Sequence, residues 1–266
     1  MKIRKIVIYD EPAVSEINIP NIVNFLKQTI PVEVIVKDNF FKEFSTQQIQ
    51  KMSESRIFEI QNTFRRHNPS QTDLELEEQF CKNSKIMEET KKPEEADSIS
   101  EVIMYDGFEI QKIIRENLQD FENQTLHVIL TNRFTCTYDE SDARYHGRAV
   151  ICANPAIIST TGIIEAPAKP REYYFEAMAL RSQGLGIESA KEQYKNRFLE
   201  YNDKRLTKVL EGYVLQIIFY NITGETFCED IQCRLNNAHW QKDLLFSQIE
   251  ISKLCKKHRE ILENLN

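Results

Sequence analysis

Cysteine and histidine side chains gather near the C-terminus of this chain, and they restrict its fold more than any other sequence feature. Cys228 and Cys233 are spaced as C-x4-C, and Cys255 and His258 are spaced as C-x2-H. Two soft-ligand pairs joined by a loop are typical of a tetrahedral zinc site. Three thiolates and one imidazole saturate the ion and leave no position for water, as in structural zinc. We therefore predict a zinc ion that fixes a C-terminal segment with little core of its own.

Two alternatives remain open for these residues. His239 lies between the two pairs and competes with His258 for the fourth ligand position. Its neighbour Trp240 instead favours a packing role for this turn. The cysteines are also compatible with ordinary buried side chains, with His258 exposed on a final helix. The sequence does not choose between His258 and His239.

The charge balance excludes several classes of function. The chain carries a net charge of −7 and has a pI near 5.4, which argues against a nucleic-acid surface and against binding to anionic membranes. No apolar run is long enough to span a membrane, and Asp10 and Glu11 interrupt the first one before it reaches signal-peptide length. We expect a cytoplasmic protein, whose reduced thiols bind metal rather than form disulfides. The expected partner is a peptide or another protein, and the oligomeric state stays undetermined.

The order of apolar segments predicts an α/β (α+β) fold with a mixed sheet. The run at 5–9 is a short β-branched strand, a helix follows Pro20, and the run at 32–36 is a second strand. A strand, a helix and a strand in this order predict a parallel pair with a right-handed crossover. Further strands are expected at 126–131, 148–153 and 156–159, with a polar loop at 132–147. Helices are expected at 170–181, 188–201 and 204–221.

We expect one domain over residues 1–266. The stretch 67–100 is polar and acidic, with one amphipathic helix around Leu74 to Phe80, and we interpret it as a mobile surface insertion. The zinc-binding segment is expected at about 224–260.

The expected helix at 204–221 leads directly to the first cysteine. Its apolar residues recur at helical spacing and include Ile217, with Asn221 one turn further along the same face. Gly224 is a suitable stop, because glycine adopts the left-handed conformation that often ends a helix. Cys228 follows four residues later.

The stretch IIFYNITGETFCEDIQC resembles a metallopeptidase motif. Metzincins carry HExxHxxGxxH, and the archaemetzincin branch extends it as HExxHxxGxxHCxxxxC with a later CxxC. Gly224 falls on the motif glycine, Cys228 and Cys233 fall on the first cysteine pair, and Cys255 and His258 are similar to the later CxxC. The chain is thus similar to a largely archaeal, archaemetzincin-like family of zinc metallopeptidases. The resemblance implies a metzincin-like mixed sheet, and it extends weakly to residues 120–260.

The catalytic part of that motif is degenerate in this chain. In archaemetzincins the three histidines hold a catalytic zinc and the glutamate acts as general base. Here Ile217 stands in place of the first histidine, Ile218 in place of the glutamate, Asn221 in place of the second histidine and Phe227 in place of the third. Isoleucine and phenylalanine cannot donate to a metal, and Ile218 cannot take a proton. The expectation is a pseudoenzyme that retains the structural zinc.

Three functions follow as hypotheses. The first is a non-catalytic, zinc-stabilised protein that binds a peptide or protein in the former substrate cleft. The second is a hydrolase with a relocated metal, held by His239 or by His146 with the acidic residues Asp139, Glu140 and Asp142. The third is an interaction scaffold unrelated to peptidases.

Overall fold

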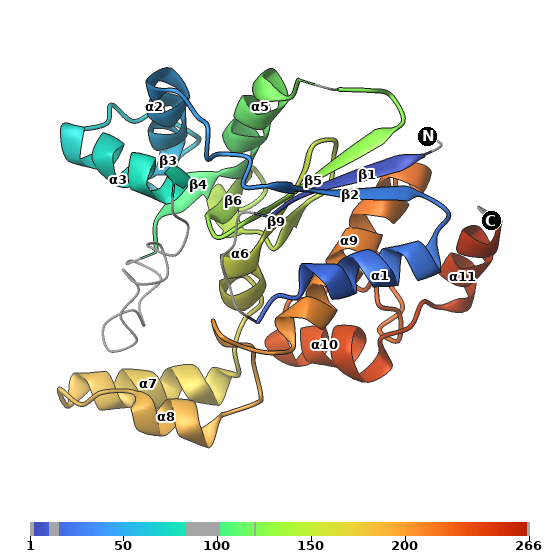
Figure 1. The fold of residues 1–266 in the computed structure, drawn as a ribbon. Coiled ribbons are helices and arrows are strands. Elements are labelled where there is room, and N and C mark those ends of the chain that lie inside the picture. The colour runs from blue at the N-terminus through green and yellow to red at the C-terminus, as the bar shows by residue number, and fades with distance from the viewer. Residues whose placement is uncertain (1–2, 11–15, 83–101, 120, 265–266) are drawn as a thin grey trace.

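A computed structural model describes residues 3–10, 16–82, 102–119 and 121–264. The chain forms a mixed α/β structure with two sheets, as expected (Figure 1). The strands are β1 Lys5–Asp10, β2 Glu33–Asp38, β3 Arg56–Ile57, β4 Met104–Asp106, β5 Thr125–Thr131, β6 Phe134–Asp139, β7 Arg144–Gly147, β8 Val150–Ile151 and β9 Ala156–Ser159. The helices are α1 Ile19–Thr29, α2 Thr46–Glu54, α3 Gln71–Lys82, α5 Gly107–Asn117, α6 Thr160–Glu165, α7 Arg171–Ser182, α8 Glu188–Gln193, α9 Leu206–Thr223, α10 Gln241–Leu245, the π-helical η2 Phe246–Ile251 and α11 Lys256–Glu263.

The larger sheet has the order β2-β1-β5-β9-β8. The first four strands are parallel, and β8 runs antiparallel to β9 at the edge. The predicted parallel pair is confirmed: Lys5 pairs with Glu33 and Tyr9 with Lys37, and α1 connects the two strands. The expected strands at 126–131 and 156–159 correspond to β5 and β9.

Helices cover both faces of this sheet. On one face Ile6, Ile8, Leu126 and Val128 pack with residues of α1 and α9 in a single hydrophobic cluster. On the other face Val7, Tyr9 and Ile129 pack with residues of α2 and α5. The alternation along β1 and β5 is what a strand buried on both faces requires. Figure 1 shows the sheet lying between these two helical layers.

The expectation of a polar loop at 132–147 is wrong, because most of this stretch forms β6 and β7. These two strands belong to the smaller sheet, which has the order β3-β4-β6-β7. Phe134 and Cys136 alternate along β6 and pack with Tyr145 of β7 and Ile57 of β3. The small core between them explains why the strands form in a sequence rich in polar residues.

Two other expected elements are shorter than the sequence suggested. The strand expected at 148–153 covers only Val150–Ile151, because Arg148 donates its backbone N–H to Thr135 instead. The helix expected at 188–201 ends at Gln193. Asn196 then adopts a left-handed conformation, with φ of 67°, which ends the helical path.

The first part of the expected insertion at 67–100 contains an ordered helix. Residues around Leu74 to Phe80 form α3, and its Glu77 is fully buried. The two carboxylate oxygens of Glu77 accept hydrogen bonds from Arg56 and Tyr105 on one side and from Arg133 on the other, at 2.8–3.3 Å. We call these four residues the Glu77 cluster. The part of the expected insertion at 83–100 lies outside the described residues.

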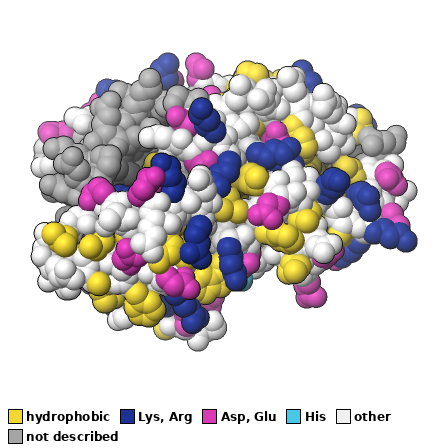
Figure 2. Space-filling model, turned by 90° about the horizontal axis from the view of Figure 1, so that it is seen from below, with side chains coloured by type: hydrophobic (Ala, Val, Ile, Leu, Met, Phe, Trp, Pro, Cys, Tyr) yellow, Lys and Arg dark blue, Asp and Glu magenta, His cyan; other side chains and the backbone are white. Residues whose placement is uncertain are grey.

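Helices α7 and α8 project from the body as an arm (Figure 1). Its inner side has a small core around Tyr173 and Phe198, while Phe175 and Met178 of α7 are exposed. Figure 2 shows apolar side chains over this arm at the left of the view. Among the described residues, no helix combines the length and the apolar character needed to cross a bilayer.

Candidate metal centre and adjoining groove

Helix α9 ends where the expected zinc-binding segment begins. Gly224 adopts the left-handed conformation with φ of 77°, and its N–H donates to Tyr220 O at 2.8 Å. This confirms Gly224 as the helix stop. The chain then turns and reaches Cys228 at the side of the helix.

A compact loop holds the first two cysteines. The N–H of Cys228 donates to Leu235 O at 2.8 Å, and the N–H of Asn236 donates to Cys233 O at 2.9 Å. The Asn236 side chain also donates to Cys228 O at 3.0 Å. These bonds fold the C-x4-C stretch back on itself, so that both thiols face the same interior point.

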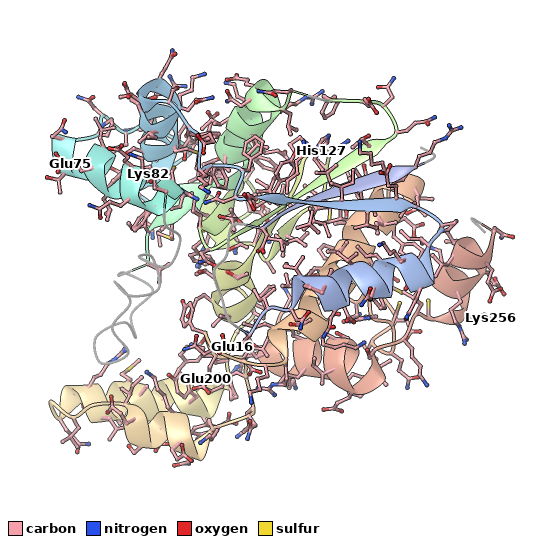
Figure 3. The ribbon with its side chains drawn as sticks, in the orientation of Figure 1. Glu16, Glu75, Lys82, His127, Glu200 and Lys256 are labelled. Carbon is pink, nitrogen blue, oxygen red and sulfur yellow. The ribbon has the colours of Figure 1, made fainter. Side chains whose placement is uncertain are left out.

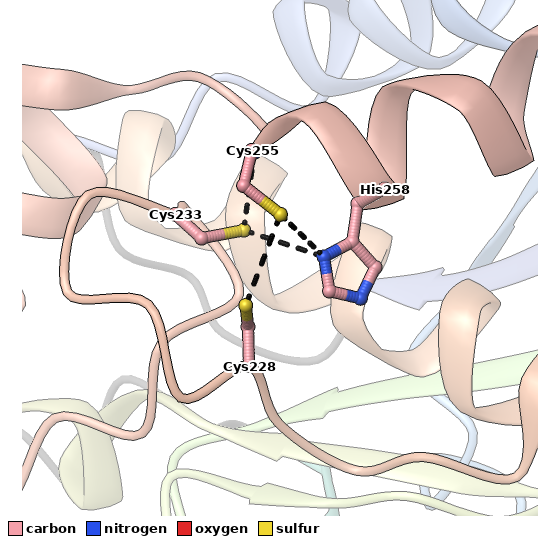
Figure 4. A group of neighbouring side chains, drawn as sticks. All are labelled: Cys228, Cys233, Cys255 and His258. Atoms are coloured by element: carbon pink, nitrogen blue, oxygen red, sulfur yellow. Dashed lines mark hydrogen bonds between the residues drawn. The ribbon is translucent and has the colours of Figure 1, made fainter.

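The second pair lies at the start of α11. Cys255 precedes the first turn of this helix, and its N–H points at Cys233 Sγ at 3.4 Å. His258 lies three residues further on and is only 2% exposed. Its ring meets Phe219 of α9 edge-on, with ring centroids 5.1 Å apart. Figure 4 shows the imidazole of His258 directed toward the three thiols.

The four side chains have the spacing of a tetrahedral zinc site. Cys228 Sγ lies 3.9 Å from Cys255 Sγ, and His258 Nδ1 lies 3.6 Å from Cys233 Sγ and 3.1 Å from Cys255 Sγ. All four donor atoms lie within 4.8 Å of one another. Zinc bonds of about 2.3 Å to sulfur and 2.0 Å to nitrogen place two tetrahedral sulfur ligands about 3.8 Å apart and a sulfur and a nitrogen ligand about 3.5 Å apart. The donors of this Cys/His cluster therefore fit zinc.

Without a cation, burial favours the neutral forms of Cys228, Cys233 and His258 in the Cys/His cluster. Burial raises the pKa of Cys233 to about 12 and raises the pKa of Cys228 above its ordinary value. Burial and the nearby Lys257 lower the pKa of His258. Protein groups alone thus keep these thiols and the imidazole neutral at pH 7. A divalent cation reverses this preference for the thiols, because a coordinating thiol is deprotonated.

His239, the alternative fourth ligand, is not part of this group of side chains. Its ring lies 3.3 Å from the side-chain nitrogen of Asn237, and its carbonyl accepts from Ala168. Among the described residues the donor set that comes together is Cys228, Cys233, Cys255 and His258.

His146, the other candidate metal ligand, and His127 of β5 both have partners within the protein. His146 of β7 pairs with Asp142 at 2.8 Å, and Asp139 lies close enough to form a second group of metal-ligand type. This group lies on the β6–β7 hairpin, where Asp139 also accepts from Ser141. His127 of β5 is buried on the α5 face of the sheet, with its Nδ1 3.2 Å from the Tyr9 hydroxyl (Figure 3).

Three of the four residues at the degenerate motif positions are buried in the core or hydrogen-bonded within helix α9. Ile217 and Ile218 are fully buried and belong to the core cluster beneath the larger sheet. Asn221 donates its side-chain amide back to Ile217 O at 2.9 Å. Phe227 is 39% exposed on the loop that precedes Cys228. Because Ile217, Ile218 and Leu126 belong to the same core cluster, helix α9 packs against the sheet that contains Leu126.

A groove of about 470 Å³ lies beside α9. Its walls come from three parts of the chain: the edge segment 147–152, the face of α9 that carries Tyr213 and Tyr220, and the loops on either side of Cys228 and Cys233. Further lining residues are Phe108, Thr137, Ala166, Pro167, Thr226, Phe227, Asn236, Asn237, Ala238 and His239. Asn236 thus contributes both to the loop that holds the cysteines and to the groove.

A buried arginine that was not predicted from the sequence supports the cysteine loop. Arg234 follows Cys233 and is 2% exposed. Its guanidinium donates to Gln248 of η2 at 3.2 Å, to Glu211 of α9 at 3.2 Å and to the Lys208 carbonyl. Gly212 leaves room for this network, since a Cβ there would lie 1.7 Å from Gln248 Oε1. In the sequence, the position of Arg234 directly after Cys233 is the signal that could have pointed to this buried network.

Comparisons with known proteins identify the family. Neither the curated proteins nor the solved structures contain a match to this chain. A family model described as "Probable metallopeptidase family (DUF6775)" matches residues 2–265. The match extends over both sheets, the groove and the Cys/His cluster, and the chain therefore belongs to this probable metallopeptidase family.

Proposed function

We propose that this protein is a non-hydrolytic member of its family that binds an extended peptide in the groove and uses zinc to hold one groove wall in place. The observation that carries the proposal is the environment of Ile217 and Ile218. A hydrolytic zinc needs donors with an open water position, and it needs a base beside that water. These two apolar side chains are instead packed in the core.

The remaining groove residues do not replace the missing donors. Among the described lining residues only His239 and Cys152 are of a type that commonly binds zinc. Burial raises the pKa of Cys152 to about 12, so its thiol stays protonated at neutral pH. One imidazole does not make a catalytic zinc site.

The edge strand supports a peptide as the ligand. Ser159 of β9 donates its N–H to Ala149 O, which makes these two residues a hydrogen-bonded pair. Because pairs alternate along antiparallel strands, the backbone groups of Val150 face away from β9, toward the open edge. An extended peptide adds to such an edge through main-chain hydrogen bonds.

Zinc in the Cys/His cluster would act structurally. Three thiolates and His258 fill the four positions of a tetrahedral ion. The ion ties α11 to the loop between α9 and α10, which also forms part of the groove wall. An archaemetzincin-like origin and a cytoplasmic location remain part of this proposal.

Metal stoichiometry and peptide hydrolysis together test the proposal. Elemental analysis of the purified protein should give about one zinc per chain, the occupancy of a single closed site. A mixed fluorogenic peptide library should remain uncleaved by this preparation. Cleavage that disappears on chelation and returns with zinc would refute a non-hydrolytic function.

The rival function, a hydrolase with a relocated metal, has a separate signature. The group Asp139, Asp142 and His146 is the second set of described side chains with suitable donors. A second metal that is lost in His146→Ala, together with cleavage activity, would establish the rival. A second metal lost in His239→Ala would place it in the groove. Family membership disfavours the third hypothesis, a scaffold unrelated to peptidases.

A further inference from the structure

The lining of the groove is positively charged, although the whole chain is acidic. The whole chain carries a net charge of −7. Yet the described residues that line the groove include Arg148 and His239 and no aspartate or glutamate. Arg148 therefore supplies the permanent charge of the lining, and the groove favours an anionic group.

Arg148 is held at the rim of the groove. Its Nε donates to Thr137 Oγ1 at 2.7 Å, and its backbone carbonyl accepts from Thr135 Oγ1 at 3.1 Å. These bonds fix the stem and one edge of the guanidinium. The hydrogen bonds from Ser141 are the main cause of the lowered pKa of Asp139, and the charges of His146 and Arg148 add to them. The terminal nitrogens of Arg148 remain donors of the geometry that suits a carboxylate.

The rest of the lining is apolar and aromatic. Phe108 is 57% exposed, Phe227 is 39% exposed, and Tyr213 and Tyr220 form the helix side. Exposed aromatic rings around a concave surface are typical of a site that takes apolar side chains. Such sites contain few polar groups, and those groups fix the orientation of the ligand. In this groove Arg148 is a group of that kind.

We propose that the groove selects extended peptides that carry an aspartate or glutamate side chain, which pairs with Arg148, next to apolar side chains that contact the aromatic lining. This inference rests on the proposed peptide-binding function and adds the chemistry of the ligand. The carboxylate forms a charge-assisted, bidentate pair with the guanidinium, while the peptide backbone adds to the edge at Val150.

The experiment is a selection of displayed random short peptides on the immobilised, zinc-loaded protein. Wild type, Arg148→Lys, Arg148→Gln and Arg148→Glu are compared. Arg144→Glu serves as the matched control, because Arg144 is exposed on the neighbouring strand β7 and does not line the groove. Melting temperature and zinc content are measured for each variant to verify folding.

The selected pool should be enriched in aspartate and glutamate for wild type and for the Arg144 control. Enrichment should weaken for Arg148→Lys, vanish for Arg148→Gln and change to lysine and arginine for Arg148→Glu. An individual acidic peptide should bind Arg148→Gln about tenfold more weakly, the scale of one charge-assisted hydrogen bond.

The outcomes separate this inference from the proposed function. Peptides selected without acidic enrichment, or an acidic preference that Arg148→Glu leaves unchanged, would overturn the role of Arg148 and leave peptide binding intact. A wild-type protein that selects no peptide at all would overturn peptide binding itself.

Discussion

The Cys/His cluster takes its four side chains from one segment near the C-terminus, whereas the Glu77 cluster takes its side chains from four separate segments. Cys228 and His258 are the outer members of the first, and they lie on the two sides of α10 and η2 in the chain. Arg56 and Arg133 belong to β3 and to the β5–β6 turn, with α3 inserted between them. Local spacing can encode the first arrangement, while only the tertiary fold assembles the second.

The two clusters also differ in how their charge is balanced. The guanidinium groups of Arg56 and Arg133 offset the burial of the Glu77 carboxylate, and Tyr105 adds a hydroxyl donor. This cluster is complete with protein groups alone. The Cys/His cluster has donors for a cation and no permanently charged side chain among its four members, so we expect that an ion is needed for its full stability.

Loss of a zinc ligand should have the largest effect. We expect Cys233→Ser to lose zinc and to melt more than ~15 °C below wild type, because structural zinc contributes about 10–16 kcal/mol in small zinc domains. Hydrogen exchange should show that the segment after Gly224 opens first. Zinc analysis and calorimetry measure the change.

Cys152→Ser is the control for this variant, since Cys152 lies outside the Cys/His cluster. It should keep its zinc. Equal melting of Cys233→Ser and wild type would mean that the C-terminal segment is stable without the ion, and the contrast between the two clusters would fail.

Breaking the Glu77 cluster should have the next largest effect. Glu77→Gln removes the Glu77 carboxylate from both buried arginines, although Arg56 keeps its ion pair with Asp73 at 3.1 Å, and we expect the free energy of unfolding to fall by about 3–5 kcal/mol. The zinc content should stay unchanged. Denaturant unfolding gives the difference.

The neighbour Glu78 provides the matched control for Glu77. It lies on the same helix, its side chain is 46% exposed, and it pairs with Lys82. Glu78→Gln should change stability by less than about 0.5 kcal/mol. If both variants behave alike, α3 is not anchored by Glu77.

Acid should weaken both clusters, for a different reason in each. Burial raises the pKa of Glu77, but the charges and hydrogen bonds of Arg133 and Arg56 outweigh burial, and the folded pKa lies below the ordinary 4.5. The unfolded chain therefore binds more protons, and this part of the stability is lost as pH falls below that value. In Glu77→Gln the slope of stability against pH below 5 should be shallower.

Zinc release should begin at higher pH than loss of the Glu77 contribution. The thiols and His258 must be deprotonated to bind, so protons compete with the ion as pH falls. Competition with a chromogenic chelator across pH 7 to 5 should show weakening affinity in wild type. Affinity independent of pH would contradict thiolate and imidazole ligation.

Replacement of the alternative ligands should have the smallest effect. His239→Ala and Asn221→Ala should keep the wild-type zinc content, because neither side chain joins the Cys/His cluster. Stability should change by about 1 kcal/mol or less. A loss of half the bound metal in His239→Ala would instead indicate a second site in the groove.

The sequence predicted the parts of the structure that depend on local spacing. The parallel pair β1–β2, the helix stop at Gly224 and the grouping of Cys228 with His258 all follow from short-range patterns. The sequence could not decide between His258 and His239 as the fourth ligand. The path of the chain from Cys233 to α11 determines which imidazole lies beside the three thiols. Phe219 then fixes the orientation of the His258 ring.

Parts of the structure that depend on distant contacts were missed. The alternation of Phe134 and Cys136 was a usable signal for β6, but the surrounding polar residues concealed it. Glu77 lies in a charged helix that the sequence pattern assigns to the surface. Its burial is due to Arg56 and Arg133, and no spacing rule links residues so far apart in the chain. The role proposed for Arg148 depends on the tertiary fold, which places it in the same groove lining as Tyr213.

X-ray absorption spectroscopy at the zinc edge tests the central claim most directly. The proposed closed site predicts a shell of three sulfur atoms at about 2.3 Å and one nitrogen at about 2.0 Å, with no bound water. The spectrum should stay unchanged in His239→Ala. A zinc ion with an exchangeable water and mainly nitrogen or oxygen ligands would contradict the account, because it would place a hydrolytic centre in this protein.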